Sequence, residues 1–498
     1  MRLKRWLYLL HRWAGIALCL VMALWFLSGM VMMYVGYPKL TPAEQLQGLA
    51  PLPAQGCCVP LEQALQAAGL DKAPTQWRLA TVAGQPRYLF SDARGKSVAA
   101  VDARSGARIT GVDEAQAVAA AAHFAGGAAA RSLGPVQEDA WTHSRALDAH
   151  RPLHRVAVDD GRWLYISGVS GEVVRDASLS ERTWGWLGAW LHWLYLFRGG
   201  ALNAWWTDIV IWLSLAGGVL GLSGLVVGLW RWRFKGRYKS GSRSPYRGRM
   251  ARWHHILGLL GGTLALSWVI SGLLSMNPWK VFEAQGLKPD RQAYAGGPLQ
   301  AGAAPPADLV LARLAAQGFE ARLLEWRRIG GSHYVWAQSA SGAWLLDARG
   351  EVVPGLDEAS LVVAARAMLP GAPLLQRQWL RGYDAHYYAR EAHTMTGQRE
   401  RPLPALRLVF GDALAHHIVL DPASGAVLQV SNSRQRAERW LFAFAHSFDL
   451  PQLLALRPLW DGWMLVFSLA GLGLSLTGVV MGWRRLLRPP AHAPGQQA

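Results

Sequence analysis

Cysteine is nearly absent from this chain, which has three cysteines in 498 residues. Cys19 lies inside a long apolar run, and Cys57 and Cys58 are adjacent. Three cysteines cannot form a disulfide framework, and a disulfide between neighbouring residues is strained. We therefore expect Cys57 and Cys58 to be two separate thiols without a redox role.

The sequence also lacks the motifs of several enzyme classes. It contains no phosphate-binding glycine motif and no nucleophile–base signature, which argues against nucleotide chemistry on this chain. Acidic residues are few, with 33 Asp and Glu against 51 Lys and Arg. The basic excess does not indicate a nucleic-acid partner, because it gathers beside apolar runs: nine Lys or Arg and no acidic residue occupy residues 230–253, four occupy 1–12, and Arg484, Arg485 and Arg488 follow the last run.

Four apolar runs cover residues 13–35, 207–230, 256–277 and 460–483. Each is long enough to cross a bilayer, which takes about 20 residues. The first run follows a basic start, is longer than a signal-peptide core and has no cleavage site after it, so we expect a retained anchor. The positive-inside rule then places both termini and the basic 231–253 loop in the cytoplasm of a multi-pass inner-membrane protein.

The two halves of the chain repeat the same pattern around four histidines. His11 is followed by glycine after 4 residues, tryptophan after 14, Ser-Gly after 17 and methionine after 22, and His254 is followed by the same residues at the same spacings. His192 and His446 form a second pair, because each follows a Trp-Leu by six residues and precedes a tryptophan by 14. The pattern predicts an internally duplicated chain.

The predicted fold is a membrane α-helical protein with four transmembrane helices and two α+β domains in the periplasm, where alternating short runs and Ala-rich segments favour strands and helices. We expect these units: the N-terminus and helix 1 at 1–35, outer domain 1 at 36–183, an interfacial helix and helix 2 at 184–230, a cytoplasmic loop at 231–253, helix 3 at 254–277, outer domain 2 at 278–438, an interfacial helix and helix 4 at 439–488, and a cytoplasmic tail at 489–498.

The histidines have the arrangement expected of haem ligands. Parallel repeats are related by an axis along the membrane normal, so equivalent histidines should face each other at one depth: His11 with His254 near the cytoplasm, and His192 with His446 near the outer surface. Paired histidines hold haem iron in many electron-transfer proteins. Because the chain has no Cys-x-x-Cys-His motif, we expect two non-covalent, b-type haems.

Other interpretations of these residues are open. A single histidine at a membrane boundary is more often an interfacial residue or a helix–helix hydrogen-bond donor than a ligand. His255 competes with His254 as a ligand, although the repeat favours His254. A stripe of glycines at 217, 221, 224 and 228 is typical of close helix packing. Two interpretations are open for one group of histidines and tyrosines in the second outer segment: a metal or ligand site, and a solvated domain surface, which we favour. The group consists of His386, Tyr387, Tyr388, His393, His416 and His417.

Several motifs together resemble the PepSY-associated transmembrane protein family. They are the His-Arg-Trp-x-Gly start at His11, the Trp-Leu-x-x-x-x-His segments, the Gly-Glu-Val-Val turns and the Ser-Leu-Thr-Gly-Val-Val-x-Gly-Trp-Arg-Arg ending. The chain is similar to the iron-regulated inner-membrane proteins and the FoxB-type ferric-siderophore reductases of that family. This resemblance implies PepSY-like periplasmic domains and two b-type haems, on His11, His254, His192 and His446, that carry electrons outward.

We therefore expect a di-haem protein that takes electrons from a quinol or a cytoplasmic flavoprotein and reduces a ferric siderophore or another periplasmic ferric complex. One alternative is a haem-free, membrane-anchored PepSY module that binds or regulates a periplasmic protease or an assembly partner. Another is a permease for iron or siderophore, which would need polar residues in its spans. The four apolar runs contain few of them.

Overall fold

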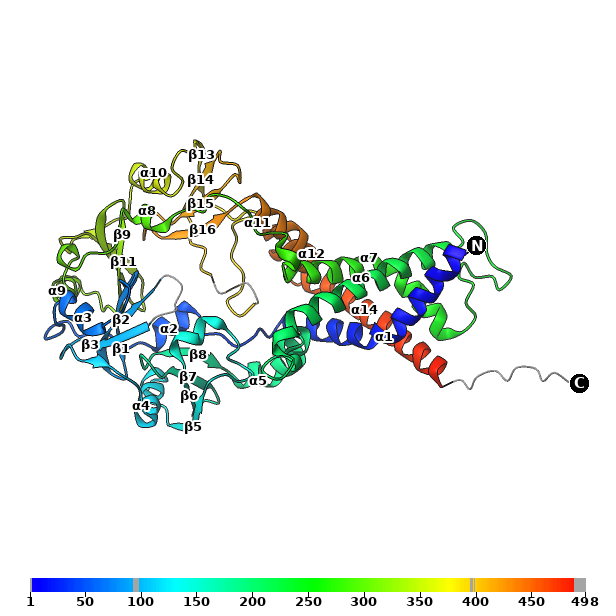
Figure 1. Ribbon diagram of the computed structural model, residues 1–498, viewed down its shortest axis with the longest axis horizontal. Coiled ribbons are helices and arrows are strands. Elements are labelled where there is room, and N and C mark those ends of the chain that lie inside the picture. The colour runs from blue at the N-terminus through cyan, green and yellow to red at the C-terminus, as the bar shows by residue number, and fades with distance from the viewer. Residues whose placement is uncertain (1, 93–97, 395–396, 398, 488–498) are drawn as a thin grey trace, which may run out of the picture.

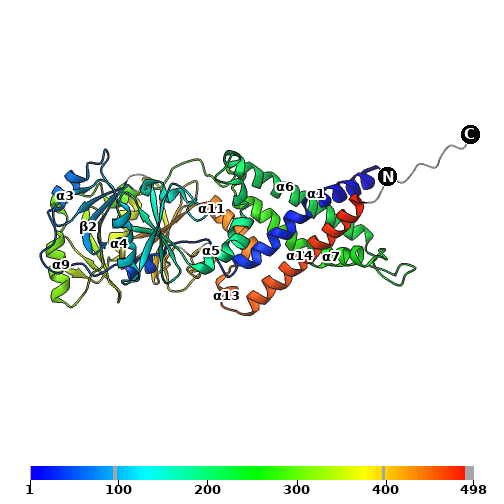
Figure 2. The same cartoon turned by 90° about the horizontal axis from the view of Figure 1, so that it is seen from below.

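A bundle of helices and a set of β-sheets occupy opposite ends of the molecule (Figure 1, Figure 2). The computed structural model describes residues 2–92, 98–394, 397 and 399–487. Within that part of the chain, four helices are long and apolar enough to cross a membrane, which confirms the predicted membrane character. They are α1 (Arg2–Met32), α6 (Trp206–Arg231), α7 (Arg249–Ser275) and α14 (Leu459–Leu486).

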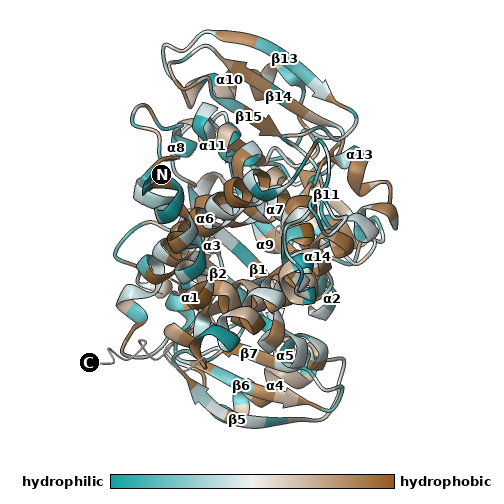
Figure 3. Cartoon of the chain, turned by 90° about the vertical axis from the view of Figure 1, so that its right-hand side faces the viewer, coloured by the Kyte–Doolittle hydropathy of each residue, from teal (hydrophilic) through white to brown (hydrophobic). Residues whose placement is uncertain are grey.

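The bundle has one strongly basic end. The start of α1, the end of α14 and the segment between α6 and α7 lie together at the end farthest from the sheets (Figure 1). Viewed from this end, the bundle helices are mostly hydrophobic, while the start of α1 is hydrophilic (Figure 3). We call this the basic end of the bundle, and the opposite end the sheet end.

Small residues allow the four helices to approach closely. A Cβ atom at Gly217 of α6 would lie 2.9 Å from Met22 Cε of α1, and one at Gly471 of α14 would lie 2.4 Å from Phe26 Cε1. Contacts this short are unavailable to larger side chains, so glycine sets the distance between helices. The close packing predicted from the glycine stripe is therefore present.

One large sheet joins the two outer segments. Its strand order is β12-β11-β10-β9-β1-β2-β3-β4. Half of the strands come from the first outer segment and half from the second: β1 (Gln76–Val82), β2 (Gln85–Ser91), β3 (Val98–Asp102), β4 (Arg108–Ile109), β9 (Leu323–Ile329), β10 (Ser332–Gln338), β11 (Ala343–Leu346) and β12 (Val352–Val353). The helices α3 (Leu61–Ala68) and α9 (Ala307–Ala316) pack on it in a shared core.

The junction between the segments is the antiparallel pair of β1 and β9. Trp77 is opposite Trp326 and Leu79 is opposite Leu324 in this pair, and all four side chains are buried in the shared core. This pairing could not be predicted, because the two strands are far apart in the chain and no hairpin turn connects them.

Each outer segment also has a second, four-stranded antiparallel sheet of its own, covered by helices. The first consists of β5 (Ala130–Val136), β6 (Leu153–Val158), β7 (Trp163–Ser167) and β8 (Val173–Ala177), with α4 (Glu114–Phe124) in its core. The second consists of β13 (Leu374–Leu380), β14 (Ala405–Phe410), β15 (His417–Leu420) and β16 (Val427–Ser431), with α8 (Arg291–Ala295) and α10 (Glu358–Ala367). Several antiparallel sheets with packed helices agree with the predicted α+β character.

Cys57 and Cys58 form a disulfide in the structure, so the expectation of two separate thiols is wrong. The backbone conformation explains the difference. Cys58 has a left-handed φ of 105°, which brings the two neighbouring side chains to the same side of the chain. Cys19 is a free, buried thiol.

Candidate functional site

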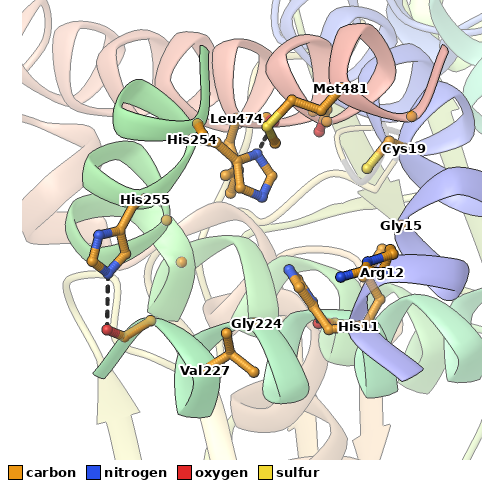
Figure 4. A pocket seen from close by; sticks show the side chains of 18 of the residues that line it. His11, Arg12, Gly15, Cys19, Gly224, Val227, His254, His255, Leu474 and Met481 are labelled. Carbon is orange, nitrogen blue, oxygen red and sulfur yellow. Dashed lines mark hydrogen bonds between the residues drawn. The ribbon is translucent and has the colours of Figure 1, made fainter. Parts of the chain in front are cut away.

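His11 and His254 face each other across the bundle and are called the basic-end pair here. His11 lies on α1 and His254 on α7, and the centroids of their rings are 6.2 Å apart. Figure 4 shows the two side chains entering the same cavity from opposite walls.

Both rings of the basic-end pair are oriented through their Nδ1 atoms. His11 Nδ1 lies 3.4 Å from the carbonyl oxygen of Leu220 on α6, and His254 Nδ1 lies 3.1 Å from that of Leu474 on α14. A carbonyl oxygen only accepts hydrogen bonds, so each Nδ1 is the protonated, donating nitrogen. In the neutral form of each ring, the Nε2 atom carries the lone pair that can bind a metal.

The second pair, His192 and His446, lies at the sheet end and is called the sheet-end pair. Each histidine follows a π-helical turn, at Trp186–Trp190 and Arg439–Phe444, and such turns often occur at functional sites. The chain then leaves the helix through a left-handed residue two positions later, Leu194 or Phe448. The segments predicted as interfacial helices are helical, and these turns adjoin the short helices α5 (Leu179–Gly185), α11 (Ser433–Glu438) and α12 (Ala445–Ser447).

Serine hydroxyls orient the rings of the sheet-end pair. Ser28 Oγ lies 3.0 Å from His192 Nδ1, and Ser271 Oγ lies 3.0 Å from His446 Nδ1. Each serine donates its own proton to a backbone carbonyl one helical turn earlier, so the shared proton belongs to Nδ1.

Desolvation and the facing His446 ring lower the pKa of His192 to about 3. Burial also lowers the pKa of His446, so both rings are neutral, as metal ligation requires.

The spacing of both pairs suits a single metal ion between two imidazoles. The ring centroids of His192 and His446 are 6.1 Å apart, close to the separation in the basic-end pair. Two imidazoles on opposite sides of a metal, each bound at about 2 Å, have ring centroids roughly 6 Å apart. Four neutral rings, each held by its Nδ1 proton, are a suitable donor set for two bis-histidine haem irons.

A cavity of about 1280 Å³ surrounds the basic-end pair. Ligand pockets usually measure about 300–1,000 Å³, so this one has room for a macrocycle. Glycine creates the space beside His11, because a Cβ at Gly224 would lie 2.7 Å from His11 Cε1. Gly478 lies near His254 but makes room chiefly for Cys19, whose Sγ would lie 2.5 Å from a Cβ there. Basic side chains surround the cavity at its basic end, and they can pair with acidic groups of a ligand: Lys4, Arg5, Arg12, Arg231, Arg249, Arg484 and Arg485.

His255 lines the same cavity but does not face His11. Its Nε2 lies 2.9 Å from the carbonyl oxygen of Gly228, and its Nδ1 lies 2.8 Å from Ser244 Oγ. Figure 4 shows the ring turned away from His11 and His254 toward α6. With both nitrogen atoms engaged, His255 is placed as a helix-packing residue, and His254 is the residue that completes the pair.

The outer group of histidines and tyrosines is more enclosed than expected. Tyr387 and His416 are buried, which contradicts the predicted solvated surface for these two residues, whereas His393 is exposed as predicted. Hydrogen bonds permit this burial, because Tyr387 donates to the carbonyl oxygen of Pro402 and His416 Nδ1 bonds Asp412. Among the residues described, no group of three or more His, Cys, Asp or Glu side chains is placed to hold a metal ion.

The partners of the histidines were not predicted. Ser28 and Ser271 are equivalent in the repeat, and so are Ser223 and Thr477, whose hydroxyls lie 3.4 and 3.1 Å from the Nδ1 atoms of His11 and His254. Their matched positions were a usable signal. The Leu220 and Leu474 carbonyls gave no signal, because any residue type supplies a backbone carbonyl.

None of the curated proteins matches the chain. The model of one protein family, described as the PepSY-associated TM region, matches residues 8–485, which include both histidine pairs and the outer segments between them. The chain belongs to this PepSY-associated transmembrane family.

Proposed function

We propose that this protein holds two b-type haems, one at each histidine pair, and transfers electrons across the membrane. The observation that carries the proposal is the equivalence of the two pairs. In each, two rings about 6 Å apart are fixed through Nδ1 by a neighbouring element and leave Nε2 to bind iron.

The residues of the chain would each have a definite task. The four histidines would hold the haem irons through Nε2, and the serines and carbonyls that accept from Nδ1 would fix the ring orientation and increase the basicity of Nε2. Gly224 leaves space beside the His11 ring. When bound, haem supplies reversible one-electron transfer, and the apolar helices around it keep water away.

The pairs are arranged in series along the bundle. His192 contacts Ser28 of α1, which is 17 residues from His11 on the same helix. At about 1.5 Å per residue, this separates the levels of the two pairs by roughly 25 Å along the helix axis. Such a separation suits a relay between two sides of a membrane rather than a single site.

Direction and partners belong to the same proposal. The basic end would be cytoplasmic by the positive-inside rule, with the sheets in the periplasm and the two halves arisen by duplication. Electrons would enter from a quinol or a cytoplasmic flavoprotein and leave to a ferric siderophore or another ferric complex. Hard oxygen ligands prefer Fe(III) to Fe(II), so one electron would loosen such a complex.

A measurement of haem content tests this proposal. We expect purified protein to give about two haems per chain in a pyridine haemochrome assay, with the sharp reduced bands of low-spin iron after dithionite. Protein from haem-replete cells with a ratio near zero would overturn the proposal, and would favour a haem-free, membrane-anchored binding module.

A further inference from the structure

A segment of the second outer domain crosses to the first one beside the sheet end of the bundle. It comprises residues 384–394, between β13 and β14, and we call it the strap (Figure 1). Tyr388 and Arg390 of the strap bind Asp449, three residues after His446. Glu391 pairs with Arg457, just before α14. These three contacts fasten the strap to its own half of the chain.

The side chain of His393 contacts two residues of the other half. Its Nε2 lies 2.8 Å from Glu44 Oε1, and its Nδ1 lies 3.3 Å from Glu181 Oε1. A carboxylate only accepts hydrogen bonds, so both ring nitrogens must donate to satisfy both partners. Only the imidazolium form of histidine has two N–H donors.

The two glutamates are held in place by contacts that do not involve His393. Glu44 belongs to α2 (Pro42–Gly48) and Glu181 to α5, and each uses its other oxygen, Oε2, in a capping box with the helix N-cap, Thr41 or Ser178. Capping boxes fix the side chain of the third helical residue. The two Oε1 atoms are therefore presented together from two different helices.

The groups around His393 favour a cation at this position. Partial burial lowers the pKa of His393, but the hydrogen bonds and charges of Glu44 and Glu181 outweigh it and raise the pKa above its ordinary value. Burial and the same two glutamates raise the pKa of Asp176 to about 7. The charged side chains that face this cluster are Glu44, Glu181, Asp176, Lys39, Arg162 and Arg175.

We propose that protonated His393 is a pH-dependent latch that fastens the strap to the first outer domain. In the protonated form it bridges Glu44 and Glu181; in the neutral form it can donate to only one of them. The contact is fully present below the ordinary histidine pKa and is lost as the pH rises through the raised value. Because the pKa of Glu44 is lowered, its carboxylate stays charged through this range.

Release would free one end of the strap only. The contacts of Arg390 with Asp449 and of Glu391 with Arg457 do not involve His393, so the strap would swing from these ties. The hydrogen bond from the Lys39 ammonium to the carbonyl oxygen of Thr394 would break at the same time. The movement would take place beside the His446 segment, and it requires no bound haem.

Hydrogen–deuterium exchange of the strap tests the latch in the full-length protein. Wild type is compared with His393→Arg, which stays charged and has a forked donor group, and with His393→Gln, which is never charged. We expect the wild-type backbone of residues 384–394 to be protected like His393→Arg at about pH 5.5 and to exchange like His393→Gln at about pH 8.5. Exposure times are scaled to the intrinsic exchange rate at each pH.

Two further variants separate the latch from a general loss of stability. Glu44→Gln and Glu181→Gln keep the capping boxes, which accept glutamine, and should each move the wild-type midpoint of opening to lower pH. His123→Gln, at an exposed position on α4, should leave the midpoint unchanged. Equal protection of wild type at both pH values, or a midpoint that neither glutamate variant shifts, would overturn the proposal. Neither result depends on whether haem is bound.

Discussion

A Cβ atom added to Gly224 would lie 2.7 Å from Cε1 of His11. Gly224 is on α6 and His11 on α1, so the missing side chain on one helix makes room for the imidazole of another. Gly478 differs, because a Cβ there would lie 2.5 Å from Cys19 Sγ and would keep an ordinary 3.5 Å contact with Cε1 of His254. The space beside the His11 ring is thus defined by a residue that has no side chain.

Gly224→Ala should displace the His11 ring and weaken the basic-end site. We expect the haem content to fall from about two per chain toward one, because a misplaced axial ligand binds iron poorly. The control is Gly462→Ala on α14, where a Cβ meets nothing within 4 Å. Alanine favours helix over glycine by up to about 1 kcal/mol, so the control should be at least as stable as wild type. An unchanged haem content in Gly224→Ala would contradict the proposed role of Gly224 in making room for the His11 ring.

Replacing one histidine should remove one haem. His11→Ala or His254→Ala should abolish the basic-end haem, and His192→Ala or His446→Ala the sheet-end haem, since each change removes one of two axial bonds. His255→Ala serves as the matched control and should retain both haems, because its ring faces Ser244 and Gly228. Haem content and reduced spectra measure the result. Loss of haem in His255→Ala but not in His254→Ala would show that the ligand on α7 is the neighbouring residue.

Ser28→Ala and Ser271→Ala should alter the sheet-end haem without removing its ligands. Each change deletes the acceptor of a histidine Nδ1 proton, and losing such a partner typically weakens metal binding about 10–100-fold. We expect a shifted midpoint potential for one haem, measured by spectroelectrochemistry. Ser275→Ala is a suitable control, because Ser275 is exposed on α7 and its hydroxyl donates to the Gly272 carbonyl oxygen of its own helix. Identical titrations for all three variants would show that these serines do not tune the site.

The acceptor can be tested apart from the haems. Chemically reduced protein should be reoxidised anaerobically by a ferric siderophore, with Fe(II) appearing in a chelator trap. His446→Ala should keep the basic-end haem but reoxidise at least tenfold more slowly, because the relay then ends before the sheet end. Slow reoxidation by every ferric complex, with fast reoxidation by a quinone, would keep the electron transfer and discard the ferric substrate.

Much of the membrane part could be predicted because its signals are local. Four apolar runs become four helices, and the matched spacing after His11 and His254 places these rings opposite each other. The same repeat favoured His254 over its neighbour His255, in agreement with the geometry. The π-helical turns before His192 and His446 had no sequence signal, because the residues of those turns also suit an ordinary helix.

Contacts between distant segments could not be predicted. The pairing of Trp77 with Trp326 joins strands separated by about half of the chain, and strand partners that far apart are not encoded in either strand alone. His393 bonds Glu44 and Glu181 for a similar reason: each glutamate is fully explained as a helix-capping residue when the sequence is considered locally. The disulfide of Cys57 and Cys58 depends on one backbone angle that cysteine does not favour.

The continuous eight-stranded sheet limits how the two halves can move. The halves are packed together in the bundle and joined again by β1 and β9 at the far end of the molecule, so the chain forms a closed frame (Figure 1). A rocking motion that opened the two ends of the bundle alternately would have to break the main-chain hydrogen bonds of that junction and expose its buried tryptophans. A frame of this kind suits the electron transfer that we propose, because electrons need fixed distances and no moving gate.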